Sequence, residues 1–110
     1  MNSRLGKARL RVPKTAQPGE VIEVRTMVEH PMESGFRLDN TGKPISRHIA
    51  TGFSCTYNGR EVFRATLHPA VSTNPYLVFY VVAQESGELV FSWSDDRGGH
   101  VTEARQLMVS

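Results

Sequence analysis

The chain has 110 residues, a common length for one domain, so we expect residues 1–110 to fold as a single domain. Its net charge is only +2, and both signs of charge are mixed along the sequence. Nucleic-acid binding needs clustered cations, but the basic residues near the start are separated by apolar ones: Arg4, Lys7, Arg9, Arg11 and Lys14. With Cys55 as the single cysteine, an internal disulfide is excluded.

No targeting or membrane segment is evident. The first residues, MNSRLGKARLRV, are basic but are not followed by the apolar region of a signal peptide. No apolar stretch is long enough to span a bilayer. The sequence therefore predicts a protein without its own export signal and without a membrane partner.

Strand periodicity dominates the first half of the chain. After a short strand near 8–12, residues 21–30 alternate, with Ile22, Val24, Thr26 and Val28 on one face. Such alternation is typical of a half-buried strand. Residues 53–57 repeat the pattern and are followed by Asn58-Gly59, the strongest two-residue hairpin signal. The returning strand is predicted over about 60–67.

The second half predicts three more strands. Residues 76–83 are apolar on both faces, so we expect a strand covered on one face by its own core and on the other by something else. Residues 88–94 place Leu89, Phe91 and Trp93 on one face, and a turn at 95–99 leads to a last strand at about 101–109. About seven antiparallel strands predict an all-β, immunoglobulin-like sandwich.

Two proline-containing loops interrupt the strands. The first, 30–45, contains His30, Pro31, Met32 and Gly35, and the second, 68–75, begins with His68-Pro69. Proline fixes its own φ and restricts the residue before it, so we expect both loops to be stiff.

Few side chains have the sequence context of a catalytic or metal-binding group. Cys55 lies in mid-strand between Phe53 and Tyr57, an apolar setting that favours a buried structural thiol over a nucleophile. The four histidines (His30, His48, His68 and His100) lack the close spacing of a structural zinc site. Asp95-Asp96, before two glycines, is typical of a turn. We therefore expect no enzyme site, no metal and no cofactor.

The remaining feature of the sequence is a set of residues suited to a surface that binds another protein. Interfaces are enriched in aromatic residues and methionine, which favours Met32, Tyr76, Phe79 and Tyr80 as anchors. With the two loops, the predicted partner-binding residues are His30, Pro31, Met32, Gly35, His68, Pro69, Tyr76, Phe79 and Tyr80.

Several segments together resemble the SoxZ family. His30 to Gly35 resembles its HPMETG-type loop, with Ser34 where family members commonly have Thr. Cys55 to Gly59, Val62-Phe63 and Leu67 to Ala70 resemble its central hairpin and following loop. The segments at 74–77 and 93–96 resemble its later strands, and the similarity runs from about Val12 to Val109. The two His-Pro loops in order with CTYNG form a specific combination.

The resemblance implies a heterodimer with SoxY, the SoxYZ carrier of thiosulfate oxidation, and transient contacts with other Sox enzymes. In that family SoxY carries the cargo on a cysteine in a flexible C-terminal arm. This sequence ends RQLMVS without such an arm, so we expect the partner of the cargo-bearing subunit. The resemblance also implies a periplasmic location, reached by export together with a signal-bearing SoxY.

Two other functions stay open from the sequence. One is direct binding of a sulfur compound or a metal through Cys55 or the histidines. The other is an independent immunoglobulin-like accessory or adhesion domain. The isolated chain is also expected to self-associate if its partner surface is uncovered.

Overall fold

The computed structural model describes residues 7–30, 38–44, 49–67 and 74–110, which form strands and turns. No helix long and apolar enough to cross a membrane occurs in these ranges. The strands are β1 Ala8–Arg11, β2 Thr15–Ala16, β3 Val21–Val28, β4 Ala50–Tyr57, β5 Arg60–Thr66, β6 Tyr76–Val82, β7 Gly87–Asp95 and β8 His100–Val109.

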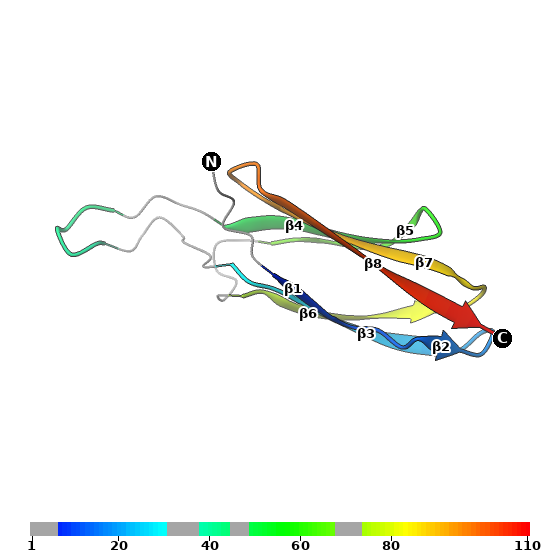
Figure 1. The fold of residues 1–110 in the computed structure, drawn as a ribbon. Coiled ribbons are helices and arrows are strands. Elements are labelled where there is room, and N and C mark those ends of the chain that lie inside the picture. Colours follow the sequence, from blue (N-terminus) through cyan, green and yellow to red (C-terminus); the bar gives the residue numbers. More distant parts are fainter. Residues whose placement is uncertain (1–6, 31–37, 45–48, 68–73) are drawn as a thin grey trace.

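The strands form two sheets that lie face to face (Figure 1). One sheet has the order β1-β3-β6 and the other the order β2-β8-β7-β4-β5. The predicted all-β, immunoglobulin-like sandwich is thus confirmed. One strand was not predicted: β2 has only two residues and pairs in parallel with the end of β8. Two residues are too few to give a periodic pattern.

The core lies between the sheets and consists of the faces that alternation predicts. Ile22, Val24 and Val28 of β3 are at most 2% exposed. From the facing sheet, β4 contributes Phe53, Cys55 and Tyr57, and β7 contributes Leu89, Phe91 and Trp93, all buried. Thr26 is buried among them, and its hydroxyl donates to the carbonyl of Leu77 on β6. A buried hydroxyl needs such a partner.

An aromatic cluster joins the two sheets. The ring of Phe53 lies 5.1 Å from that of Trp93 and 5.8 Å from that of Phe79, measured between centroids. Phe63 of β5 stacks on Phe79 of β6 at 4.3 Å with an interplanar angle of 5°. Aromatic pairs at such distances add to the stabilisation from burial. The cluster therefore fixes the inward face of β6.

The β4–β5 hairpin turns at Asn58 and Gly59, as predicted. Both residues have positive φ (51° and 84°), which asparagine and glycine tolerate. The Asn58 side chain also accepts a hydrogen bond from the Glu88 amide at 2.9 Å. Beside it, the buried phenol of Tyr57 donates to the Glu85 carbonyl and so ties β4 to the β6–β7 connection.

A buried contact between His30 and Asp95 links the two sheets at the other end. His30 follows β3, and its Nε2 lies 3.5 Å from Oδ2 of Asp95 at the end of β7, with both side chains fully buried. The His30 amide donates to Oδ1 of Asn74, whose own amide donates to the His30 carbonyl, both at 2.8 Å. Asp95 Oδ1 accepts from the amides of Arg97 and Gly99, as expected of a turn-forming aspartate.

Replacing Asp95 is expected to destabilise the fold. Asp95→Ala removes the acceptor of two turn amides and leaves His30 buried beside an apolar methyl group. The free energy of unfolding should fall by about 3 kcal/mol. Urea denaturation followed by Trp93 fluorescence measures the change.

The matched control is Asp39→Ala. Asp39 Oδ1 likewise accepts from the amides of Thr41 and Lys43, but this turn is exposed to solvent. Its loss should cost less than about 1 kcal/mol. Equal destabilisation by the two substitutions would contradict a stabilising role for the buried contact.

Candidate partner interface

The predicted partner-binding residues divide into three groups. Pro31, Met32, Gly35, His68 and Pro69 lie outside the described residues. His30 is 1% exposed and makes the contact with Asp95, so it anchors the start of the first loop instead of offering a surface. Tyr76, Phe79 and Tyr80 all lie on β6.

The three aromatic residues of β6 point to opposite sides of the sheet. Phe79 is 4% exposed and belongs to the core, whereas Tyr76 and Tyr80 are 55% and 63% exposed. Side chains alternate along a strand, so an odd-numbered and an even-numbered residue cannot share a face. Only the two tyrosines are available to another molecule.

Two valines extend this exposed surface. Val78 and Val82 lie between and beyond the tyrosines on the same face and are 41% and 47% exposed. Val21 is paired with Val82 in the register and is exposed as well. We call Tyr76, Val78, Tyr80, Val82 and Val21 the β6 patch. Contiguous exposed apolar side chains of this kind mark interaction sites.

The patch borders an unpaired strand edge. Among the strands of the described ranges, β6 pairs with β3 alone, and β5 is likewise the last strand of its own sheet. Between these two edges lies a groove of about 530 Å³, lined by Val62 of β5 and by Tyr80 and Val82 of β6. An unpaired edge presents free backbone donors and acceptors, to which another chain can add.

The candidate reactive groups lie away from the patch or lack a reactive setting. Cys55 is fully buried, and burial raises the pKa of its thiol from 9.0 to about 12. His100 is exposed, and its Nε2 lies 3.0 Å from the Thr102 hydroxyl. Within the described ranges no three His, Cys, Asp or Glu side chains gather as a metal site. His48 and His68 lie outside those ranges.

Solved structures with a similar fold include superoxide reductases and a sulfur carrier protein. A superoxide reductase (neelaredoxin) from Ignicoccus hospitalis has a TM-score of 0.72 at 13% identity over 96% of this chain and 82% of that one. The sulfur carrier protein SoxY from Chlorobium limicola f thiosulfatophilum gives 0.66 at 16% identity, over 94% and 78%. A neelaredoxin from Archaeoglobus fulgidus gives 0.59 at 21%, over 94% and 88%. At these identities the similarity concerns the fold.

Comparison with curated protein sequences gives no match. The comparison with family models does give one. The model described as sulphur oxidation protein SoxZ matches residues 10–106, nearly the whole chain. The chain therefore belongs to the SoxZ family.

Proposed function

We propose that this protein is the non-catalytic subunit of a SoxYZ sulfur-carrier complex and that it binds SoxY through the β6 patch. The observation that carries the proposal is the row of exposed apolar side chains on β6, which no described part of the chain covers. Family membership supports SoxY as the partner.

The chemistry of the patch suits a lasting complex. Tyrosine gives a large contact area at little cost in conformational entropy, and valine adds apolar surface without polar groups to desolvate. A stable heterodimer would bury on the order of 1,200–2,000 Å² in total. The solved SoxY structure from Chlorobium limicola f thiosulfatophilum has a fold similar to that of this chain.

In this proposal the subunit helps SoxY to present its sulfur-loaded arm to other Sox enzymes in the periplasm during thiosulfate oxidation. The two His-Pro loops remain proposed contacts. His30, the first residue of the first loop, is held just after β3 by its contacts with Asp95 and Asn74. Without its partner the chain is expected to self-associate through the same patch.

The alternative of direct sulfur binding depends on Cys55. Attack on a sulfur compound requires a thiolate with access to solvent. The thiol of Cys55 is fully buried, and its raised pKa reduces the small fraction of thiolate that an ordinary cysteine has at neutral pH. Both observations favour the role of SoxY's partner over that of a second sulfur carrier.

Polar substitutions on the patch should weaken the complex without unfolding the chain. For Tyr76→Ser/Tyr80→Ser we expect the Kd for SoxY to rise at least about 100-fold, because exposed tyrosines of an interface are frequent hot spots. The melting temperature of the isolated subunit should change little, since both side chains are largely exposed. Isothermal titration calorimetry and size-exclusion chromatography of the co-expressed pair measure the effect.

Met108→Ser is the control for this experiment. Met108 is 61% exposed on β8 of the five-stranded sheet, away from β6. Its substitution should leave the Kd unchanged. Unchanged binding by the double tyrosine variant would place the interface elsewhere. Separate elution of the two wild-type subunits at micromolar concentration would contradict the proposal and favour an independent accessory domain.

Cys55 should be unreactive in the folded protein. A pKa of about 12 in place of 9.0 lowers the thiolate fraction about 1000-fold at pH 8. We expect iodoacetamide to label Cys55 at least about 100-fold more slowly in buffer than in guanidinium chloride. Mass spectrometry after exposure to tetrathionate, which transfers a thiosulfate group to a thiolate and releases thiosulfate, should detect no adduct on the native chain, whereas such an adduct would favour direct sulfur binding.

A further inference from the structure

The outer face of the three-stranded sheet is positively charged toward β1 and apolar toward β6. The register aligns Arg9 of β1 with Met27 of β3 and Tyr76 of β6 in one row. In the next row Arg11 lies beside Arg25, and Arg25 beside Val78. Cations therefore stand at the β1 edge and apolar side chains at the β6 edge.

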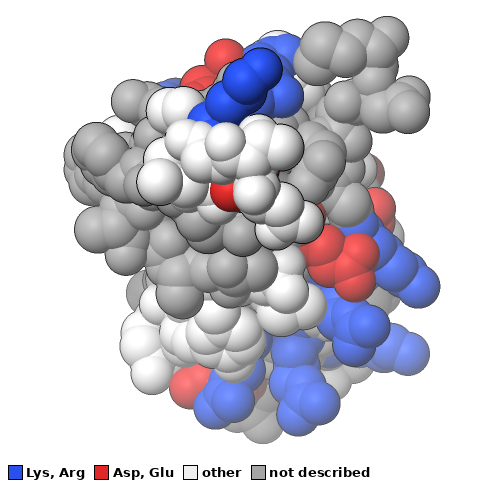
Figure 2. All heavy atoms as spheres, turned by 90° about the vertical axis from the view of Figure 1, so that its left-hand side faces the viewer, with Lys and Arg blue, Asp and Glu red and all other residues white. Residues whose placement is uncertain are grey.

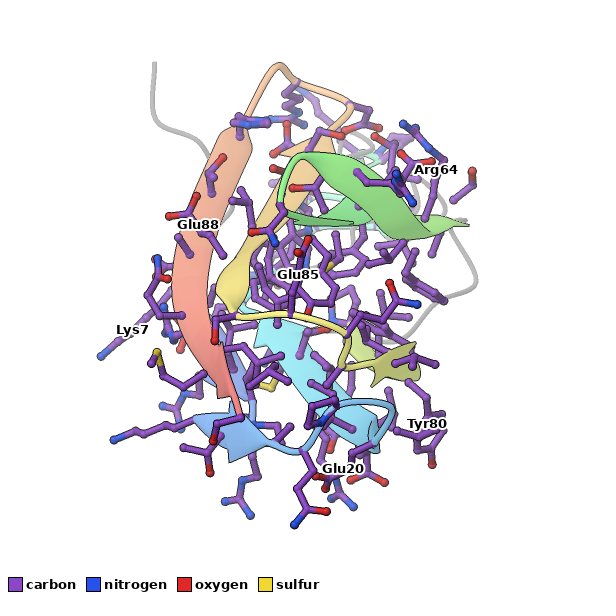
Figure 3. The ribbon with its side chains drawn as sticks, turned by 90° about the vertical axis from the view of Figure 1, so that its right-hand side faces the viewer. Lys7, Glu20, Arg64, Tyr80, Glu85 and Glu88 are labelled. Carbon is purple, nitrogen blue, oxygen red and sulfur yellow. The ribbon has the colours of Figure 1, made fainter. Side chains whose placement is uncertain are left out.

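Many of the Lys and Arg side chains visible in Figure 2 lie over the lower part of the molecule, at the level of the three-stranded sheet, and others lie at the top. Lys7, just ahead of β1, and Tyr80 of β6 project at opposite sides of that sheet (Figure 3). Adjacent strands are about 4.8 Å apart, so β1 and β6, with β3 between them, are separated by about 10 Å.

The pairing of Arg11 with Arg25 is unfavourable within the chain itself. Like charges directly opposite each other on neighbouring strands destabilise a sheet. This repulsion is partly offset, because Nε of Arg25 donates a hydrogen bond to Oε1 of Glu23 at 2.5 Å. This hydrogen bond lowers the pKa of Glu23 and raises that of Arg25. Among the described residues, Arg9 and Arg11 have no such carboxylate.

The three arginines also share a hollow in the surface. A depression of about 380 Å³ is lined by Arg9, Arg11 and Arg25, with Met27 and Tyr76 on the side toward β6. A guanidinium group offers a planar set of donors that matches a carboxylate in two parallel hydrogen bonds. The hollow thus combines donors for acidic groups with the beginning of the apolar patch.

We propose that Arg9, Arg11 and Arg25, the arginine column, receive carboxylates of the protein that docks on the β6 patch. The inference rests on the proposed function and adds to it the chemistry of the partner surface. That surface should carry an apolar strip with acidic side chains about 10 Å to one side of it. Apolar contacts on β6 hold the complex together, and the arginine column sets its orientation and speeds association.

The charge distribution explains why one orientation would be selected. Rotation of the partner by half a turn about the sheet normal would place its carboxylates over Tyr80 and Val82 and its apolar strip over the arginines. Both placements bury charges without partners, which is costly. A face that was apolar throughout would not make this distinction.

The test is charge reversal in the SoxYZ complex, with association kinetics followed by stopped flow. Arg9→Glu/Arg11→Glu changes neither Arg25, nor Glu23, nor any side chain of the β6 patch. At low ionic strength we expect kon for SoxY to fall at least about 10-fold, and the difference to shrink near 1 M salt, where the Debye length is about 3 Å.

The matched control is Arg64→Glu/Arg105→Glu, which makes the same change in net charge on the five-stranded sheet. It should slow association far less. An equal effect of the two double variants would mean that only net charge matters and would overturn the inference. Competition by millimolar sulfate or thiosulfate, beyond that of chloride at equal ionic strength, would also overturn it, in favour of a site for small oxyanions.

The same experiment separates the inference from the proposed function. If the wild-type chain and SoxY associate and the arginine variant is equally fast, the arginine column is not a docking element, although the two subunits still form a heterodimer. If the wild-type proteins do not associate at any salt concentration, the proposed function fails and the inference fails with it. Circular dichroism of each variant verifies that the fold is retained.

Discussion

The stacking of Phe79 on Phe63 determines what this protein can offer to another molecule. It joins the two edge strands β5 and β6 across the core, with ring centroids 4.3 Å apart. Because side chains alternate along a strand, fixing Phe79 inward directs Tyr76, Val78, Tyr80 and Val82 outward. A shift of β6 by one residue would bury the tyrosines and expose the phenylalanine. The exposed patch is therefore a direct consequence of how the core is packed.

Most of the fold can be predicted because its signals are local. Alternation identifies the buried faces of β3, β4 and β7, and Asn58-Gly59 identifies the hairpin between β4 and β5. What sequence reasoning misses is set by contacts distant along the chain. β2 exists only because Thr15 and Ala16 lie beside the end of β8. Nothing in two residues indicates that pairing.

The candidate site is predicted only in part, for the same reason. The two-sided apolar character of 76–83 correctly indicates a strand with an uncovered face, and Tyr76 and Tyr80 lie on it. Composition alone does not separate them from Phe79, which alternation places in the core. His30 reads as a loop residue, yet its contact with Asp95, far later in the chain, buries it. The arginine column is also hidden in the sequence, because it depends on the register that sets Arg11 beside Arg25.

Because Trp93 is buried in the core, its fluorescence reports folding and is insensitive to the solvent around the β6 patch. It is the only tryptophan, it is 1% exposed, and it packs on Phe53 in the sheet opposite the β6 patch. Its emission thus reports the integrity of the core, whereas tyrosine absorbance and quenching respond to the solvent around Tyr76 and Tyr80. Excitation at the red edge, where only indole absorbs, follows unfolding of the isolated chain. In the isolated chain the core and the exposed face of β6 can therefore be followed by two different chromophores without a label.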